Sequence, residues 1–255
     1  MLSNDTTIGF IGAGNMAGAL ARGWGDPVLC TDAGSGRAAA LAAEVGGEAL
    51  DSNAELAARA DLVVLAHKPA QLDAVAAEVA PAGTPVVSLL ARTPLPALRR
   101  AYPGVPVFRV EPNVPVAVGR GVCALAVDGE PVDAALAKRV RALFARVGAV
   151  VAVPEPLMGV AGGCSGVGPA YFALLVEAQV DAAVRHGMPA AQASVLVAET
   201  MAGTAELLRE RAYDTLALRR SVTSPGGTTA RGLAELERGG VRAAFGAALD
   251  SVVGG

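Results

Sequence analysis

The sequence predicts an α/β protein: a doubly wound, mostly parallel sheet covered by helices, followed by an all-helical domain. Two patterns lead to this class. The first 153 residues alternate short β-branched runs with alanine-rich segments of helical periodicity, as in successive βαβ units. From Pro154 onward the strand-like alternation stops, and helical patterns follow one another. We therefore expect one domain over residues 1–153 and a second, helical domain over residues 154–255.

Short apolar runs in the first part have the length and β-branched composition of buried strands. They are bounded by glycine, proline and aspartate, which end regular structure. The strands are expected at residues 7–12, 27–32, 61–66, 85–90, 105–110, 122–127 and 149–153.

Helical patterns separate these strands at residues 35–45, 70–80 and 131–147. The longest helices of the second part are expected at residues 169–186 and 189–208. Both of these are apolar over much of their circumference, and helices of this kind usually bury against a partner. We therefore expect the second domain to form a homodimer or a higher homo-oligomer of dimers.

Composition excludes several classes of function. The net charge is −3 without any block of five like charges, which offers little attraction to nucleic acid or an acidic membrane surface. Cys30, Cys123 and Cys164 form no CxxC pair, so neither a disulfide framework nor a zinc site is predicted. No uninterrupted apolar run reaches the roughly 18 residues of a membrane span. We expect a cytoplasmic protein that binds neither metal, nucleic acid nor membrane.

A glycine-rich turn, "GAGNMAGAL", follows the first expected strand. Gly12 and Gly14 open a helix that continues through Asn15 and Met16, and Ala17 takes the third small-residue position of the GxGxxG/A fingerprint. The first glycine makes a tight turn, the second lets a pyrophosphate approach the backbone, and the third small residue packs helix on strand. Its position inside a βαβ unit predicts a Rossmann-type dinucleotide site.

The end of the second strand carries conflicting signals about the cofactor. Asp32 lies 20 residues beyond Gly12, where an acidic residue bonds a ribose 2′-OH and repels a 2′-phosphate. Ser35 and Arg37 follow at once and provide charge-assisted bonds to a phosphate. NADH and NADPH both stay open on this evidence, as does a solvated helix end at Arg37.

The sequence "LAHKPAQ" ends the strand expected at residues 61–66. Lys68 and Pro69 therefore come to the carboxyl edge of the sheet, where doubly wound folds bind ligands. Because the chain has only two lysines, Lys68 and Lys138, a lysine at this edge is interpreted as a cofactor contact. His67 is interpreted as a bystander.

A polar loop, "VTSPGGTTARGLAELERGG", joins two apolar helical patterns in the second domain. Such a loop presents backbone N–H groups at a helix N-terminus, where the helix dipole favours a carboxylate or a phosphate. It is also a good helix start, with Thr228 or Thr229 as the N-cap residue.

These motifs together resemble pyrroline-5-carboxylate reductase. The resemblance rests on "IGFIGAGNMAGAL", "KP" at 68–69, "PNVP" at 112–115, "SGVGPAYFALLVEAQVDAAVRHGMP" and above all "SVTSPGGTTARGLAELERGGVRAA", and runs from about Ile8 to Ala248. It implies a two-domain imine reductase with a Rossmann-type domain and a helical domain that interleaves with a second subunit. NADPH is the favoured cofactor, with NADH as the alternative.

The resemblance also assigns roles to residues. The loop Ser224–Thr229 holds the substrate carboxylate on backbone amides, so Ser224, Gly226, Gly227, Thr228 and Thr229 are substrate-binding candidates. Thr229 bonds the ring nitrogen and is the catalytic candidate. Asn113 is placed near the nicotinamide, and Asn53 and Lys68 contact the adenosine and phosphate side.

Several positions depart from the family's usual pattern. Arg92 replaces a glycine after the fifth strand, and Val114 and Val167 replace a threonine and a serine or another small residue. Glu111 stands where a methionine usually precedes "PN". Strand alternation leaves two orientations for this carboxylate: toward the nicotinamide pocket, or away from it into solvent or toward an arginine such as Arg109 or Arg120.

Three alternatives accompany this interpretation. A β-hydroxyacid dehydrogenase shares the two-domain plan but needs a lysine in its second domain, and the chain has none after Lys138. A non-catalytic dinucleotide-binding regulator would keep the fold without the reaction. An imine reductase for a related cyclic imino acid is the third.

Overall fold

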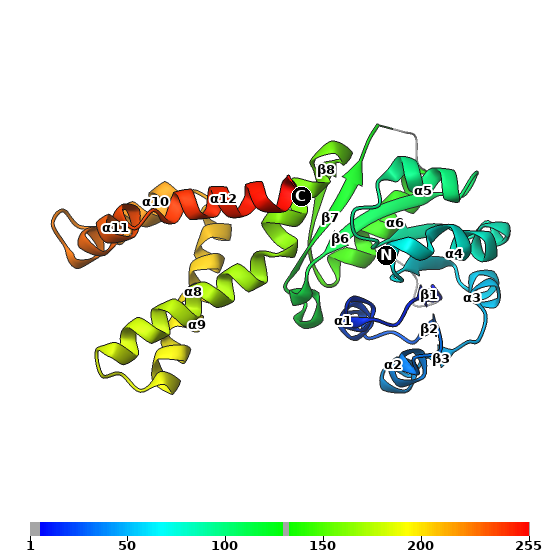
Figure 1. The fold of residues 1–255 in the computed structure, drawn as a ribbon, viewed down its shortest axis with the longest axis horizontal. Coiled ribbons are helices and arrows are strands. Elements are labelled where there is room, and N and C mark those ends of the chain that lie inside the picture. The colour runs from blue at the N-terminus through cyan, green and yellow to red at the C-terminus, as the bar shows by residue number, and fades with distance from the viewer. Residues whose placement is uncertain (1–5, 130–132, 255) are drawn as a thin grey trace. The chain divides into compact units, whose positions relative to one another are not determined.

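The computed structural model describes residues 6–129 and 133–254, and in these residues the first part of the chain forms one mixed sheet of eight strands (Figure 1). The strand order is β3-β2-β1-β4-β5-β6-β7-β8. The first six strands in this order are parallel, β7 runs antiparallel to β6, and β8 is parallel to β7. The order 3-2-1-4-5-6 is that of doubly wound dinucleotide-binding sheets, so the predicted fold class is confirmed.

The strands lie where the apolar runs place them, with slightly narrower bounds for most. They are β1 (Ile8–Ile11), β2 (Val28–Thr31), β3 (Glu48–Ala49), β4 (Leu62–Leu65), β5 (Val86–Ser88), β6 (Val107–Pro112), β7 (Gly121–Val127) and β8 (Gly148–Pro154). The strand β3 was not predicted, because it has two exposed residues and no apolar run. It pairs with β2 at the sheet edge.

Helices cover both faces of the sheet. The main ones are α1 (Asn15–Trp24), α2 (Arg37–Val45), α3 (Asn53–Arg59), α4 (Leu72–Val79), α5 (Leu95–Ala101) and α6 (Ala134–Ala145). Buried residues of α1, α2 and α6 pack with Phe10 and Val64 on one face. Those of α3, α4 and α5 pack with Ile11 and Val63 on the other. Neighbouring strand residues thus enter opposite cores, as the two-residue period of a strand requires.

An aromatic cluster joins α1 to α6 across the first of these cores. The Trp24 ring stacks on Phe10 at 5.5 Å between centroids and meets Phe144 edge-on at 5.6 Å. Its buried indole N–H donates to the carbonyl oxygen of Leu143 at 3.1 Å, so the polar end of the ring is satisfied. This cluster fixes α1, which carries the glycine-rich turn at its start.

Short helical turns complete this part of the chain. They are the 3₁₀ turns η1 (Pro69–Gln71), η2 (Ala80–Ala82), η3 (Val114–Val118) and η4 (Glu155–Leu157), the helix α7 (Met158–Ala161) and a π-helical turn at Gly162–Gly166. The described chain separates into two compact units, Met1–Pro169 and Ala170–Gly255. The change of sequence pattern at Pro154 precedes this division by the segment that holds η4, α7 and the π-helical turn.

The second unit consists of helices. They are α8 (Gly168–Arg185), which begins in the first unit, α9 (Ala190–Glu210), α10 (Thr215–Ser221), α11 (Thr228–Arg238) and α12 (Val241–Val253). Among the large hydrophobic residues left exposed are Phe172 at 53%, Leu196 at 57% and Leu236 at 58%. Ala193 and Leu218 are the buried hydrophobic residues of its described part. A unit with so small a core needs apolar cover from outside.

The helical stretch Glu155–Arg185 is long and apolar enough to cross a membrane by length and composition alone, although only 11% of its most apolar window is buried. This stretch was not predicted as a possible membrane span, because polar residues interrupt its apolar runs. Either a second copy of the chain or a membrane would bury the exposed hydrophobic residues of this unit.

Candidate functional site

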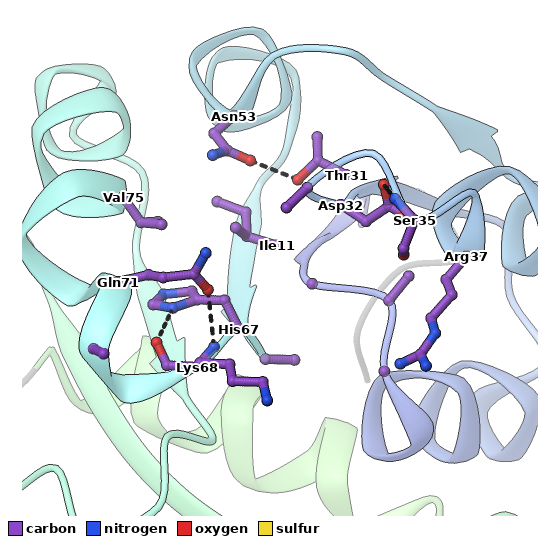
Figure 2. A pocket seen from close by; sticks show the side chains of 16 residues that line it. Ile11, Thr31, Asp32, Ser35, Arg37, Asn53, His67, Lys68, Gln71 and Val75 are labelled. Atoms are coloured by element: carbon purple, nitrogen blue, oxygen red, sulfur yellow. Dashed lines mark hydrogen bonds between the residues drawn. The ribbon is translucent and has the colours of Figure 1, made fainter.

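A cavity of about 550 Å³ opens at the carboxyl ends of β1, β2 and β4 (Figure 2). Here the strand order reverses between β1 and β4, which is the switch point where doubly wound sheets bind ligands. Its lining residues are Ile11, Gly12, Ala13, Gly14, Thr31, Asp32, Ala33, Ser35, Arg37, Asn53, Ala66, His67, Lys68, Ala70, Gln71 and Val75.

The glycine-rich turn forms one wall of this cavity. Gly12 has φ +97°, and a Cβ added there would lie 2.7 Å from the carbonyl carbon of Ala66, so only glycine fits. Gly14 has φ −79°, which other residues adopt, and a Cβ added there would meet nothing within 4 Å. Backbone beside open space at a helix N-terminus fits a pyrophosphate. Asn15 and Met16 begin α1 but lie outside the lining.

The third small residue of the fingerprint performs the predicted packing role. Ala17 is fully buried in the core beneath the turn, where a larger side chain would separate α1 from the sheet. The turn therefore has the three features that dinucleotide binding requires.

The Asp32 carboxylate is occupied by the chain itself. Its Oδ1 accepts hydrogen bonds from the backbone N–H groups of Gly34 at 2.8 Å and Ser35 at 3.1 Å. Its Oδ2 accepts from the Ser35 hydroxyl at 2.8 Å and the Ala38 backbone N–H at 2.9 Å. The Ala38 bond is the main cause that holds the pKa of Asp32 below its usual value. Because a carboxylate has about four acceptor positions, none is left for a ribose hydroxyl.

Ser35 and Arg37 stand on the same wall, at the start of α2. The N-cap residue of α2 is Gly36, with φ +75° and no side-chain cap. The Arg37 guanidinium forms no hydrogen bond or ion pair within the described residues, and Figure 2 shows it across the cavity from Lys68. Because the Ala38 N–H in the first turn of α2 donates to Asp32, the Arg37 guanidinium is the anion-binding group at this end of the cavity.

The opposite wall is the turn that follows β4. His67 Nδ1 donates to the backbone carbonyl of Lys68 at 2.9 Å, and the Lys68 N–H donates to Gln71 Oε1 at 3.2 Å. Pro69 begins η1 and shapes this turn without lining the cavity. The Lys68 ammonium has no partner within the part of the chain that the structure describes. The turn thus holds a free cation at the ligand edge.

His67, interpreted from the sequence as a bystander, lies in the wall of the cavity. Its ring lines the cavity, and its Nε2 is buried without a partner among the described residues. Burial lowers the pKa of this imidazole, which the bond to the Lys68 carbonyl opposes. Gln71 and Val75 complete this wall and carry no recognisable sequence signal. The only available signal was that a helical pattern begins directly after "KP", which places Gln71 and Val75 near the same edge of the sheet.

Asn53 also reaches the cavity, from the start of α3. Its Oδ1 accepts from the Thr31 hydroxyl at 2.6 Å, and its Nδ2 donates to Glu78 at 2.8 Å. Asn53 therefore ties β2 to α3 and α4 and has a second proton on Nδ2 for a ligand.

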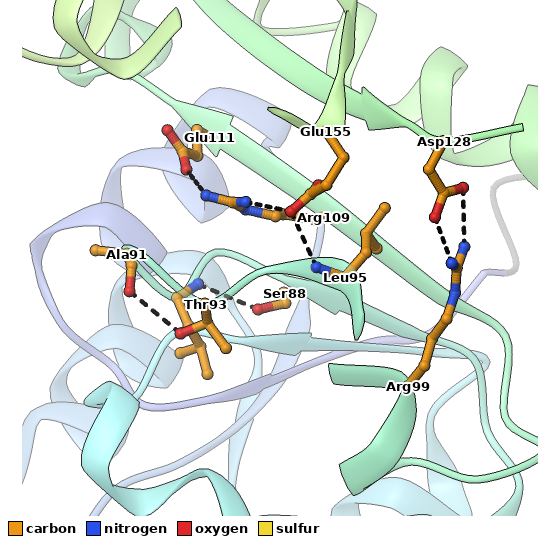
Figure 3. A network of polar contacts seen from close by, with 10 residues as sticks. Ser88, Ala91, Thr93, Leu95, Arg99, Arg109, Glu111, Asp128 and Glu155 are labelled. Atoms are coloured by element: carbon orange, nitrogen blue, oxygen red, sulfur yellow. Dashed lines mark hydrogen bonds and ion pairs between the residues drawn. The ribbon is translucent and has the colours of Figure 1, made fainter. Parts of the chain in front are cut away.

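A second polar set lies at the carboxyl end of β6 (Figure 3). Arg109 is 6% exposed; its Nη1 donates to Glu155 Oε1 at 2.6 Å, and its Nη2 donates to Glu111 Oε1. Glu155 Oε1 also accepts from the backbone N–H of Leu95 at 3.0 Å. Of the two orientations open to Glu111, the structure shows the contact with Arg109.

Asn113 lies two residues beyond Glu111 and is 7% exposed. Its Oδ1 accepts from the Val122 backbone N–H at 2.8 Å, and its Nδ2 donates to the Ser165 carbonyl at 3.1 Å. It therefore holds the π-helical turn against β6 and β7. π-Helical turns occur frequently at functional sites.

The polar loop of the second unit begins α11. Its N-cap residue is Gly227 without a side-chain cap, so the interpretation of Thr228 or Thr229 as the N-cap is wrong: both lie inside the first turn. The loop closes through a bond from Gly227 N–H to the Ser224 carbonyl at 3.0 Å. Gly226 has φ +67°, and a Cβ on Gly227 would lie 2.3 Å from the Ser224 hydroxyl oxygen. The amides of the first turn are left for an anion.

Glu111 pairs with Arg109, and two further departures from the family pattern also have a clear structural context. Arg92 lies in the loop after β5 with φ +54°, the left-handed conformation that favours glycine, so the backbone keeps the shape of the residue it replaces. Val114 begins η3 and is 63% exposed. Nothing in the structure explains Val167, which is half-buried after the π-helical turn.

Comparison with known proteins relates both units to one enzyme family. A family model described as pyrroline-5-carboxylate reductase dimerisation matches residues 155–254, and one described as NADP oxidoreductase, coenzyme F420-dependent, matches residues 7–92. The pyrroline-5-carboxylate reductase of Synechocystis is 43% identical over 197 residues, covering 76% of this chain and 73% of that protein. The chain belongs to the pyrroline-5-carboxylate reductase family.

Solved structures of the family share this fold along almost the whole chain. The Coxiella burnetii pyrroline-5-carboxylate reductase has a TM-score of 0.89 at 31% identity and covers 98% of this chain and 96% of its own. The Plasmodium falciparum pyrroline carboxylate reductase, solved with NADP bound, has a TM-score of 0.85 at 26% identity, with coverage of 98% and 96%. Family membership makes this chain a nicotinamide-dinucleotide-dependent oxidoreductase with a dimerisation domain.

Proposed function

We propose that this chain reduces the C=N bond of 1-pyrroline-5-carboxylate to give L-proline, with NADPH as the preferred hydride donor. The observation that carries the proposal is the coexistence of a dinucleotide cavity at the sheet switch point with an uncapped anion-binding helix start in a dimerisation domain. The β-hydroxyacid dehydrogenase alternative drops out because the family is a different one.

The loop Ser224–Thr229 binds the substrate carboxylate in this proposal. The free amides of the first turn of α11 donate to it, and the helix dipole favours its negative charge. The Thr229 hydroxyl, which the chain does not use for capping, orients the ring nitrogen. The Arg231 guanidinium holds the loop through a bond to the Gly226 carbonyl at 3.0 Å.

The reaction requires no strong general acid or general base from the protein. A cyclic imine is electrophilic once its nitrogen is protonated, and the bound nicotinamide supplies the hydride. The residues of this chain then have three tasks: to bind the carboxylate, to align the C=N carbon and to favour the protonated nitrogen. Lys68, Asn53 and the glycine-rich turn hold the dinucleotide in a fixed position.

The NADPH preference follows from Asp32 and its neighbours. The Asp32 carboxylate shapes the loop instead of reading the ribose, because four bonds from the chain occupy it. Arg37, which follows Ser35 at the start of α2, is then free for a 2′-phosphate, which forms charge-assisted bonds to a guanidinium. NADH remains a weaker donor in this proposal.

Apolar cover for the helical unit comes from a second copy of the chain. The dimerisation model matches residues 155–254, which include the whole apolar stretch Glu155–Arg185. We therefore propose a homodimer, or a higher oligomer of dimers, without membrane or nucleic-acid partners and in the cytoplasm. Residues 154–255 act as its substrate-binding and dimerisation domain.

A substrate panel tests the proposal. The purified protein is assayed for NADPH and NADH oxidation with the five-membered imine, its six-membered homologue and an imine that lacks the carboxylate. We expect the five-membered imino acid to have the highest kcat/KM and the imine without a carboxylate to be inactive. A higher kcat/KM for the six-membered ring would assign a related imino acid instead, and inactivity with every imine would indicate a dinucleotide-binding regulator.

A further inference from the structure

Three side chains at the carboxyl end of β6 hold the segment that returns from β8. Arg109 and Glu111 alternate along β6 and therefore point to the same side, and Asn113 follows the strand directly as the N-cap residue of η3. They contact Glu155, Gly162 and Ser165 in turn: Arg109 by an ion pair, Asn113 by a hydrogen bond, and Glu111 by packing. A Cβ on Gly162 would lie 2.9 Å from Glu111 Oε2, which shows how closely this carboxylate approaches the π-helical turn.

The charges in this set do not balance. Arg109 is the single cation, and its side chain is 7% exposed; it serves two carboxylates whose side chains are 21% exposed in Glu111 and 12% exposed in Glu155. Glu155 Oε2 is buried and has no partner within the described residues. One negative charge therefore stays uncompensated at the carboxyl end of β6. A surplus buried charge is unfavourable unless a charge from outside the cluster compensates it.

The strand positions paired with Glu111 and Arg109 carry no further cation. The paired positions on the neighbouring strands are Ala124 opposite Glu111 and Ser88 opposite Arg109, and neither is charged. The π-helical turn carries Cys164 as its titratable side chain, and this residue is exposed. Arg109 is thus the cation that contacts Glu111, and Glu155 lies on the other side of this guanidinium.

We propose that Glu111 is an electrostatic positioning residue that favours the cationic, protonated form of the substrate's ring nitrogen. The inference rests on the proposed function, in which the C=N bond receives its hydride from a nicotinamide dinucleotide bound at the carboxyl edge of the sheet. The surplus negative charge attracts an iminium and leaves a neutral imine unaffected. At an effective dielectric constant of about 20, one charge roughly 10 Å away shifts a pKa by about one unit.

Glu111→Gln tests this, because the amide oxygen still accepts the Arg109 bond while the charge is lost. Glu48→Gln is the matched control, since Glu48 also pairs with an arginine, Arg59, but on the exposed edge strand β3. The first measurement is binding to the NADP-loaded protein of L-proline, whose ring nitrogen is cationic, and of tetrahydrofuran-2-carboxylate, whose ring oxygen is neutral. We expect Glu111→Gln to weaken proline binding about tenfold and to change binding of the ether less than twofold.

The second measurement is the pH profile of kcat/KM for the imine. Glu111 raises the apparent pKa of the bound nitrogen, so in Glu111→Gln the fall of activity with rising pH moves about one unit lower. Equal losses of affinity for proline and the ether, together with an unchanged pH profile of kcat/KM, would show a merely structural role and overturn the inference. If wild-type protein reduces no imine, the proposed function fails instead, and the proline-to-ether ratio still decides the role of Glu111.

Discussion

Asp32 and Ser35 are joined by two hydrogen bonds, one from the Ser35 backbone N–H at 3.1 Å and one from its hydroxyl at 2.8 Å. An acidic residue at the end of the second strand commonly indicates recognition of a ribose hydroxyl. Here the same residue serves as a scaffold, because its acceptor positions are filled by the loop that it organises. The cofactor preference is therefore expected to depend on Arg37.

Replacing Arg37 by alanine should raise the KM for NADPH by roughly 10- to 100-fold, which corresponds to the loss of a charge-assisted bond of about 1.5–3 kcal/mol. The KM for NADH should change less than about twofold, since NADH has no 2′-phosphate to lose a partner. Steady-state kinetics with both cofactors checks this. The exposed Arg100→Ala serves as the control, and a parallel change for both cofactors would remove Arg37 from the phosphate site.

Gly12 and Gly14 should respond differently to alanine. Gly12→Ala forces φ +97° and a backbone clash, so the free energy of unfolding should fall by roughly 1–3 kcal/mol from the conformation alone. Gly14→Ala has room and an ordinary φ, so the Tm should hold while NADPH affinity falls at least about tenfold because the methyl group occupies the ligand's space. Thermal unfolding and cofactor titration measure both. Normal affinity in Gly14→Ala would place the pyrophosphate elsewhere.

His67 should make stability depend on pH. Burial lowers its pKa in the folded chain, so below about pH 6.5 the unfolded chain binds a proton that the folded chain resists. Stability is therefore complete above this pH and declines as the pH falls. In His67→Gln this contribution is absent, and the stability curve should be flatter between about pH 7.5 and pH 5.5. Urea unfolding at several pH values gives the slope of the free energy of unfolding against pH. Parallel plots for wild type and His67→Gln would contradict the role of burial.

Thr229→Ala should lower kcat/KM for the imine by roughly 5- to 150-fold, as expected for one lost hydrogen bond of about 1–3 kcal/mol. The Kd for NADPH should stay unchanged, because the hydroxyl faces the substrate in the proposed complex. Thr204→Ala is the matched control: its hydroxyl bonds only the Thr200 carbonyl in α9, at 2.7 Å. A kcat/KM in Thr229→Ala equal to that of the wild type would show that Thr229 does not bond the ring nitrogen.

Periodicity and the glycine fingerprint were sufficient to predict a doubly wound, mostly parallel sheet, a ligand site at its carboxyl edge and the Gly12–Gly14 turn. These features depend on local sequence and on long apolar runs. The role of Asp32 could not be predicted, since its four bonds depend on the path of the Gly34–Ala38 loop. The Gly227 cap was missed because threonine offers a side-chain oxygen for capping and glycine does not, yet the tight turn at Ser224 requires glycine. The orientation of Glu111 needed the strand register and the return of Glu155 to β6.

The most direct test of the central claim is the stoichiometry of one reaction. Purified protein is mixed with limiting 1-pyrroline-5-carboxylate and excess NADPH, and the NADPH consumed and L-proline formed are both quantified at completion. The account predicts one proline for each NADPH oxidised and no oxidation without the imine. NADPH binding without consumption, or consumption without proline, would contradict it.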